Sequence, residues 1–137
     1  MVYYLDSSAV LRWLLKAPGY FADYSKWSKS VSSALLRVEC NRTLGRLRLE
    51  NRINDAEVSA LKMQLQNILE SIFVVGIQDS IIERASESFP TVIKSLDAIH
   101  LATLIIIQNE SDRKLTLVTH DDNMIIAGTS LGISIYH

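Results

Sequence analysis

The sequence predicts an α/β fold, a sandwich in which helices cover a sheet of parallel strands. Short runs rich in β-branched and aromatic residues alternate along the chain with longer segments of helical apolar spacing, which is the pattern of βαβ units. The chain has 137 residues, of which 48% are hydrophobic and 21% charged, and this fits one globular domain over residues 1–137. The sequence contains no repeat, low-complexity tract or linker that would divide this domain.

The first part of the chain is predicted to contain two strands and two helices around a less regular segment. These elements fall at residues 2–5 (strand), 7–16 (helix), 19–30 (short helix, then loop), around 31 (short strand) and 35–51 (helix). The dipeptide Pro18-Gly19 ends the first helix. Gly45 lies inside the second helix and lowers its helical propensity.

The rest of the chain continues the alternation. The predicted elements fall at residues 54–72 (helix), 73–76 (buried strand), 78–88 (helix), 95–110 (helix), 115–118 (buried strand), 122–128 (short helix) and 132–136 (strand). Asn54 and Glu57 have the spacing of a capping box, which marks the start of the clearest helix. Pro90 ends the helix at 78–88. The helix at 95–110 is strongly apolar and is therefore expected to be largely buried.

Composition excludes several classes of protein. The formal net charge of −1 and the pI of about 6.3 differ from those of a strongly basic nucleic-acid binder, so any contact with nucleic acid has to come from local patches. Cys40 is the only cysteine, which excludes an internal disulfide and fits a reducing cytosol. The N-terminal residues do not resemble a signal peptide, and the longest apolar stretches are too short to span a bilayer.

Four acidic residues stand where predicted strands end or predicted helices begin. Asp6 ends the first strand, and Asp121 follows the strand at 115–118. Asp97 lies at the start of the apolar helix, and Glu39 lies in the first turns of the helix at 35–51. Because ligands of parallel sheets bind beyond the carboxyl ends of the strands, we predict that these four carboxylates converge at that edge.

Each acid also has a purely structural explanation. These explanations are a helix cap for Asp6, a partner of the helix dipole for Asp97, an ion pair with Arg42 or Arg46 for Glu39, and loop acids for Asp121 and Asp122. Independent caps and ion pairs do not predict that all the acids fall at one edge, so a shared site is favoured. Converged carboxylates repel one another, and Mg²⁺ or Mn²⁺, which prefer oxygen ligands, would relieve that repulsion. Such ions suit phosphodiester hydrolysis.

The segments YLDSSAVL, LLRVECNR, SLDAIHLAT and LVTHDDNM, in this order, resemble the motifs of PIN-domain ribonucleases, and more narrowly those of VapC-type toxins of type II toxin–antitoxin systems. The similarity covers nearly the whole chain. It implies a three-layer α/β/α sandwich with a mostly parallel sheet of about five strands. It also implies a cytoplasmic, Mg²⁺- or Mn²⁺-dependent endoribonuclease that forms a homodimer, does not contact membranes, and is held inactive by a cognate VapB-like antitoxin.

The resemblance also assigns site residues. It places the catalytic and metal-binding acids of the family at Asp6, Glu39, Asp97 and Asp121. The hydroxyl residues that would orient those carboxylates, or water, fall at Ser7 and Thr119. Asp122 could share the role of Asp121, but neighbours on an extended segment point to opposite sides, so the motif position favours Asp121.

Basic and aromatic side chains suggest where RNA could bind. Arg37, Arg42 and Arg46, with Arg48 and Arg52 nearby, could form a phosphate track that Arg12 and Lys16 extend, or they could be a solvated helix face or an antitoxin contact. A group of aromatic residues could stack on bases or could pack in a dimer or against an antitoxin; it comprises Trp13, Tyr20, Phe21, Tyr24 and Trp27.

His100 lies three residues after Asp97, on the same helical face. A metal site with oxygen ligands does not need imidazole, so a packed, hydrogen-bonded histidine is the favoured interpretation. His120 is expected to point away from Thr119 and Asp121.

Three alternative functions remain open. The first two are a non-cleaving PIN-fold module that binds RNA or protein, and a housekeeping PIN nuclease without an antitoxin. The third, a phosphoryl-accepting receiver, is disfavoured because Asp6 has no acidic neighbour and no lysine follows Lys114.

Overall fold

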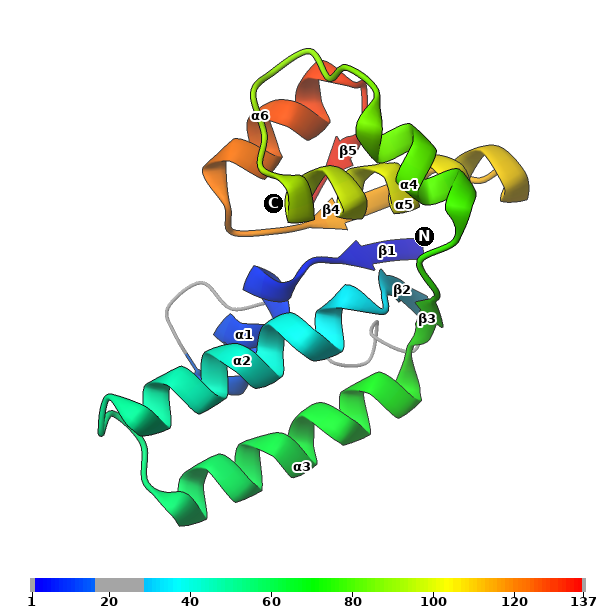
Figure 1. Cartoon of the computed structure of the whole chain (residues 1–137). Coiled ribbons are helices and arrows are strands. Elements are labelled where there is room, and N and C mark those ends of the chain that lie inside the picture. Colours follow the sequence, from blue (N-terminus) through cyan, green and yellow to red (C-terminus); the bar gives the residue numbers. More distant parts are fainter. Residues whose placement is uncertain (1, 17–28, 137) are drawn as a thin grey trace.

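The computed structural model describes residues 2–16 and 29–136, and it confirms the predicted α/β fold (Figure 1). Helices flank a five-stranded sheet in which the paired neighbouring strands run parallel. The strands are β1 (Val2–Leu5), β2 (Ser30–Ser33), β3 (Phe73–Val75), β4 (Leu115–Val118) and β5 (Ser134–Ile135). The helices are α1 (Ser7–Leu14), α2 (Leu35–Leu49), α3 (Asp55–Ser71), α4 (Asp79–Ser86), α5 (Ser95–Ser111) and α6 (Asp122–Ser130).

The strand order places β1 at the centre of the sheet. The order is β3-β2-β1-β4-β5, so the chain first builds outward from β1 through β2 to β3 and then returns to the other side of β1. Tyr4 is paired with Val31 of β2 on one side and with Leu117 of β4 on the other. The order therefore reverses between β1 and β4, and the ligand sites of open parallel sheets lie at such a point.

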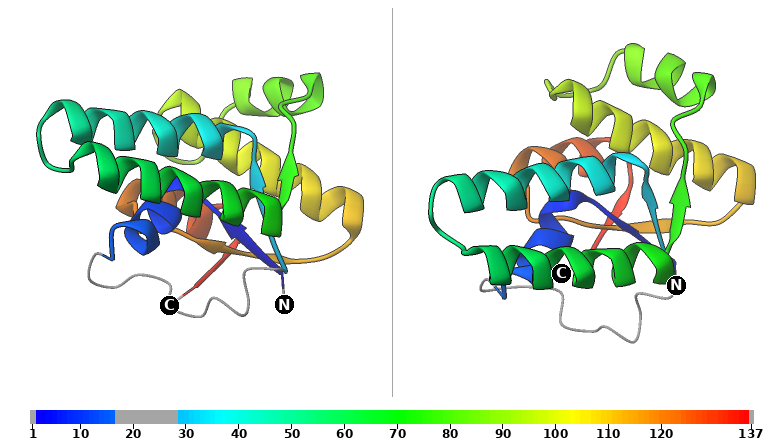
Figure 2. Two further views of the ribbon diagram at one scale, coloured as in Figure 1. Left: turned by 90° about the horizontal axis from the view of Figure 1, so that it is seen from below. Right: turned by 60° about the horizontal axis from the view of Figure 1, so that its bottom comes forward.

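Two hydrophobic cores lie on opposite faces of the sheet. Alternate residues of β1 point to opposite faces, so Tyr3 and Leu5 pack with α1, α2 and α3, whereas Tyr4 packs with α5 and α6. Figures 1 and 2 show the two groups of helices, α1 to α3 and α4 to α6. Tyr4 and Leu5 are fully buried, which fixes the end of β1 and the residue that follows it.

The predicted elements are found in the described residues, with local differences. The capping box of Asn54 and Glu57 is present at the start of α3. The prediction that residues 73–76 form a buried strand is wrong in its burial, because Phe73 is 70% exposed and Val74 39% exposed. The reason is that β3 is the edge strand of the sheet. The predictions that fall on residues 17–28, including the helix stop at Pro18-Gly19, lie outside the described residues.

Two further predictions concern Cys40 and membranes. Cys40 is a buried free thiol that packs in the core of α1, α2 and α3, and burial raises its pKa to about 12. It therefore behaves as a small apolar side chain. Over residues 2–16 and 29–136, the structure contains no helix with the length and apolar character needed to cross a membrane.

Candidate active site at the carboxyl edge of the sheet

Asp6 and Thr119 follow the two central strands at the point where the strand order reverses. Asp6 comes directly after β1, and Thr119 comes directly after β4. The backbone N–H of Asp6 donates to the carbonyl of Val118 at 3.3 Å, which continues the pairing of these strands to their ends. Both side chains are buried, at 4% and 6% exposure, so a carboxylate and a hydroxyl face each other in the interior.

The Asp6 carboxylate accepts hydrogen bonds on both oxygens. Ser8 Oγ donates to Oδ1 at 2.6 Å, the backbone N–H of Ala9 donates to the same oxygen at 3.1 Å, and Thr119 Oγ1 donates to Oδ2. The bond from Ala9 makes Asp6 the N-cap of α1, in agreement with the structural explanation of this acid. Burial raises the pKa of Asp6, although the bonds from Ser8 and Thr119 partly offset that effect.

The hydroxyl oxygens of Ser8 and Thr119 also accept hydrogen bonds from backbone N–H groups. The N–H of His120 donates to Ser8 Oγ at 2.9 Å, and the N–H of Asp121 donates to Thr119 Oγ1 at 3.1 Å. The hydroxyl oxygens lie 3.2 Å apart. Because each hydroxyl donates its one proton to Asp6, its oxygen is free to accept from the backbone N–H of His120 or Asp121.

The hydroxyl that contacts Asp6 belongs to Ser8, which the sequence interpretation did not name. The role of Ser7, to orient carboxylates or water, stays a prediction. Ser7 is the first residue of α1 and is half-buried. The signal that could have found Ser8 is the cap itself, since a residue two positions after an N-cap aspartate lies within reach of its carboxylate.

Asp121 and Asp122 differ in burial and in their hydrogen bonds. Asp121 is half-buried and is the N-cap of α6, where Oδ1 accepts from the N–H of Asn123 at 2.8 Å and of Met124 at 3.3 Å. Asp122 is an exposed residue in the first turn of α6. Of the two adjacent acids, only Asp121 is among the groups whose charge raises the pKa of Asp97.

Glu39 contacts His100 rather than the arginines of its own helix. His100 Nε2 lies 2.6 Å from Glu39 Oε1, and His100 Nδ1 lies 2.7 Å from the hydroxyl of Tyr4. His100 is 1% exposed, so the favoured interpretation of a packed, hydrogen-bonded histidine holds. The predicted alternative, an ion pair of Glu39 with Arg42 or Arg46, is wrong, because the structure gives this carboxylate to His100 and pairs Arg46 with Glu50 at 3.8 Å.

The pKa of Asp97 is affected by the charges of the other three acids. It lies in the first turn of α5 and is half-buried. Burial raises its pKa, the charge of Asp121 raises it further, and the charges of Asp6 and Glu39 act in the same direction. Because the charges of the other three predicted acids act on Asp97, each of them lies within electrostatic range of this carboxylate. We call this group, Asp6, Glu39, Asp97 and Asp121, the acidic edge.

The acidic edge offers oxygen ligands that suit a hard divalent ion, but its side chains do not form a complete coordination shell. Among residues 2–16 and 29–136, no group of three histidine, cysteine, aspartate or glutamate side chains is close enough to hold an ion as it stands. Mg²⁺ is commonly bound by one or two carboxylates and keeps several waters, so a complete protein cage is not needed. Carboxylates whose pKa values are raised by burial and mutual repulsion are also the groups that gain most from a cation.

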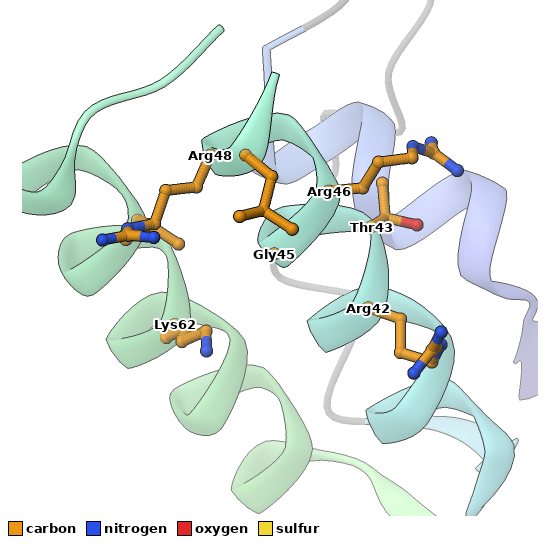
Figure 3. A pocket seen from close by; sticks show the side chains of 8 residues that line it. Arg42, Thr43, Gly45, Arg46, Arg48 and Lys62 are labelled. Atoms are coloured by element: carbon orange, nitrogen blue, oxygen red, sulfur yellow. The ribbon is translucent and has the colours of Figure 1, made fainter. Parts of the chain in front are cut away.

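A basic groove lies between α2 and α3 (Figure 3). It has a volume of about 760 Å³, and its lining includes Arg42, Gly45, Arg46, Arg48 and Lys62. Figure 3 shows Arg42 and Arg46 on one side of Gly45, with Arg48 and Lys62 on the other. We call this feature the α2–α3 groove.

The structure separates the predicted arginines. Arg37 lines a different hollow with Gln66 and Glu70, whereas Arg42, Arg46 and Arg48 line the α2–α3 groove. Arg48 forms an ion pair with Asp55, at the start of α3.

Most of the predicted aromatic group lies outside the described residues. The exception is Trp13, on α1, where the Nζ atom of Lys16 lies 3.8 Å from the ring centroid. This cation–π contact links one of the predicted aromatic residues to one of the predicted basic residues.

Comparison with known proteins supports the fold. The structure is similar to that of PAE2754 from Pyrobaculum aerophilum, with 22% sequence identity and a TM-score of 0.59 over 92% of this chain and 84% of that one. It is also similar to FitAcB from Neisseria gonorrhoeae, with 16% identity and a TM-score of 0.70 over 99% of this chain and 97% of that one. No protein-family model and no curated protein matches the sequence. Identities this low show a shared fold alone.

Proposed function

We propose that the chain is a metal-dependent endoribonuclease of the PIN-domain type, and the toxin of a VapBC-type toxin–antitoxin pair. The observation that carries the proposal is the buried carboxylate of Asp6 at the reversal point of the sheet, together with the charges of Asp6, Glu39 and Asp121 that all raise the pKa of Asp97. The PIN-like motifs of the sequence place the acids of that family at the same four positions.

The acidic edge would hold Mg²⁺ or Mn²⁺, directly or through water. A bound divalent ion supplies polarisation of the scissile phosphate and a lower pKa for water. Asp6, Glu39, Asp97 and Asp121 would provide the oxygen ligands. Ser8 and Thr119 keep both oxygens of Asp6 in a fixed orientation, so this carboxylate does not have to reorganise when the ion binds.

The α2–α3 groove supports a nucleic-acid substrate. Arg42 and Arg46 lie three and seven residues after Glu39, so on helix α2 they continue along nearly the same face from the acidic edge into the groove. Cations beside an acidic site allow the RNA backbone to bind next to the carboxylates that cut it. The remaining predicted contact, Arg37, faces elsewhere and is not part of this track.

The proposal includes the partners that the resemblance implies. A VapB-like antitoxin would cover the acidic edge, and a second copy of the chain would form the homodimer. The structure exposes several large apolar side chains that a partner could cover, among them Phe73, Ile82 and Val92. A cytoplasmic location fits the single buried thiol of Cys40.

Cleavage of RNA in the presence and absence of metal tests the enzyme. The wild-type chain should cut RNA with Mg²⁺ or Mn²⁺, leave a 5′-phosphate and a 3′-hydroxyl, and stop when EDTA is added. Asp6→Asn should abolish cutting, whereas the matched control Asp79→Asn, an acid in the first turn of α4, should cut normally. Cutting that survives EDTA, or Asp6→Asn cutting at the wild-type rate, would refute the proposal. RNA binding without cutting would favour the non-cleaving module.

Growth of a host that expresses the chain tests the toxin assignment separately. Expression of the wild type should arrest growth, and expression of Asp6→Asn should not. A protein that cuts RNA with metal in vitro but does not arrest growth would fit the housekeeping nuclease instead.

A further inference from the structure

A buried chain of hydrogen bonds runs from the central strand to Glu39. It starts at the hydroxyl of Tyr4 in β1, passes through the imidazole of His100 in α5 and ends at the carboxylate of Glu39 in α2. Its two contacts measure 2.7 and 2.6 Å. Tyr4 is fully buried and His100 is 1% exposed, so the contact between these two side chains is shielded from water.

The chemistry of the three groups sets the direction of the chain. An ionised carboxylate only accepts hydrogen bonds, so Nε2 of His100 has to carry a proton. The Tyr4 hydroxyl keeps its own proton, because burial raises its pKa well above the ordinary value, and it can therefore donate to Nδ1. The imidazole is then held as the Nε2–H tautomer, with its donor aimed at one oxygen of Glu39.

Packing fixes the ring as well as its protons. The rings of Tyr4 and His100 meet edge to face, with centroids 5.8 Å apart and an interplanar angle of 81°. His100 therefore cannot rotate away from Glu39 without breaking a contact on its other side. Glu39, by contrast, is a longer and more flexible side chain with 18% of its surface exposed. The position of its carboxylate therefore depends on the contact with His100.

We propose that His100 is a positioning residue for Glu39, held in one tautomer by Tyr4. His100 would occupy one oxygen of the Glu39 carboxylate and leave the other oxygen for the metal ion. This inference rests on the proposed function. Orientation of an acidic ligand by a buried donor is the kind of outer interaction whose removal weakens metal sites by about 10–100-fold.

The tautomer of His100 provides a test that needs neither metal nor RNA. In protein labelled with ¹⁵N at histidine, His100 should give the Nε2–H pattern of long-range ¹H–¹⁵N correlations. Tyr4→Phe keeps the buried ring and removes the donor to Nδ1, so the Nδ1 resonance should shift to that of an acceptor without a hydrogen bond, while Glu39 keeps the proton on Nε2. The matched control is Tyr3→Phe, the next residue of β1, whose ring packs in the opposite core. An Nδ1–H pattern in the wild type would overturn the proposal.

Metal affinity then separates positioning from folding. His100→Leu should weaken Mn²⁺ binding, measured by calorimetry without RNA, by about 10-fold or more. His100→Gln can place an amide N–H near the position of Nε2, and it should recover most of the affinity. If His100→Leu and His100→Gln lose Mn²⁺ affinity equally, at equal thermal stability, the proposal is overturned. If His100→Leu does not fold, Tyr4→Phe can replace it in the measurement of Mn²⁺ affinity, because this substitution hardly changes the volume of the core.

The outcomes also distinguish this inference from the proposed function. A wild type that neither binds Mn²⁺ nor cuts RNA overturns both. A wild type that binds and cuts, together with a His100→Leu variant of unchanged affinity, overturns only the role of His100.

Discussion

The acidic edge and the α2–α3 groove lie on the same molecule but hold their charges differently. At the acidic edge, Asp6 is 4% exposed and is held by side chains from two segments 111 residues apart, Ser8 and Thr119. In the groove, the side chains of Arg46 and Arg48 are 66% and 47% exposed and pair with nearby residues along the chain. Burial makes the first region rigid and costly to charge, whereas exposure leaves the second adjustable and screened by salt.

This contrast separates chemistry from binding. A fixed, desolvated carboxylate is suited to hold an ion and to act on a bond, because the surrounding groups do not reorganise. An exposed row of cations attracts a phosphate backbone without fixing it closely. Changes at the acidic edge should therefore alter metal binding and turnover, and changes in the groove should alter RNA affinity and its salt dependence.

The largest expected effect belongs to Asp6. Asp6→Asn should lower metal-dependent cleavage by more than the roughly 10–100-fold expected when only an orienting group is removed, because this substitution removes a ligand itself. The same variant should raise the free energy of unfolding of the metal-free protein at pH 7, since a desolvated charge is removed. Activity assays and denaturant titrations measure the two effects. A variant that is both inactive and less stable would mean that Asp6 is mainly structural.

Thr119 and Ser8 should produce the next largest effects. Thr119→Val and Ser8→Ala each remove one donor to Asp6, so each should weaken Mn²⁺ binding by roughly 10–100-fold. Ser7→Ala is the matched control, and it should leave Mn²⁺ affinity unchanged because the structure gives the contact to Ser8. A larger decrease in Ser7→Ala than in Ser8→Ala would support the role that the resemblance implies for Ser7.

The pH dependence of metal-induced stabilisation follows from the raised pKa values of Asp6 and Asp97. An acid whose folded pKa exceeds its ordinary value of 3.8 stabilises the fold most below that value, and this contribution is lost as pH rises through the folded pKa. A cation needs the ionised form, so the rise in Tm on adding Mn²⁺ should be large at pH 7 and should shrink as pH falls toward 4. Differential scanning calorimetry with and without Mn²⁺ measures this rise. A rise that does not change with pH would indicate binding elsewhere.

The groove should respond to salt rather than to metal. The double variant Arg42→Gln/Lys62→Gln should weaken binding of RNA to an inactive Asp6→Asn background at every sequence tested. The slope of log affinity against log salt should fall by about one for each cation–phosphate interaction that the substitutions remove. Arg113→Gln, an exposed arginine just after α5, is the control. An unchanged slope in the double variant would remove the groove from the RNA path.

The sequence predicted those features of the fold and site that depend on local signals. The capping box of Asn54 and Glu57 and the apolar strand at 115–118 are local patterns, and both elements are present in the structure. The exposure of Phe73 depends on the position of β3 at the edge of the sheet, which no local pattern contains.

Among the site residues, the same division holds. Asp6 is predictable from its place after a strand, but its bond to Thr119 joins residues 113 apart in sequence. The contact of Glu39 with His100 joins residues 61 apart in sequence, on two helices that belong to different cores of the molecule. The sequence could name both residues without showing that they touch.

The smallest expected effect concerns the floor of the groove. Gly45 lies inside α2, and a Cβ atom built there meets nothing within 4 Å, so Gly45→Ala should stabilise the fold by about 0.5–1 kcal/mol through helix propensity alone. Gly132 gives the opposite case, because its φ of 75° strains any other residue, and Gly132→Ala should destabilise. Denaturant unfolding measures both changes. Since Gly45→Ala alters no charge, it should leave the salt dependence of RNA binding unchanged, and a change in slope would mean that RNA reaches the floor between Arg42 and Arg48.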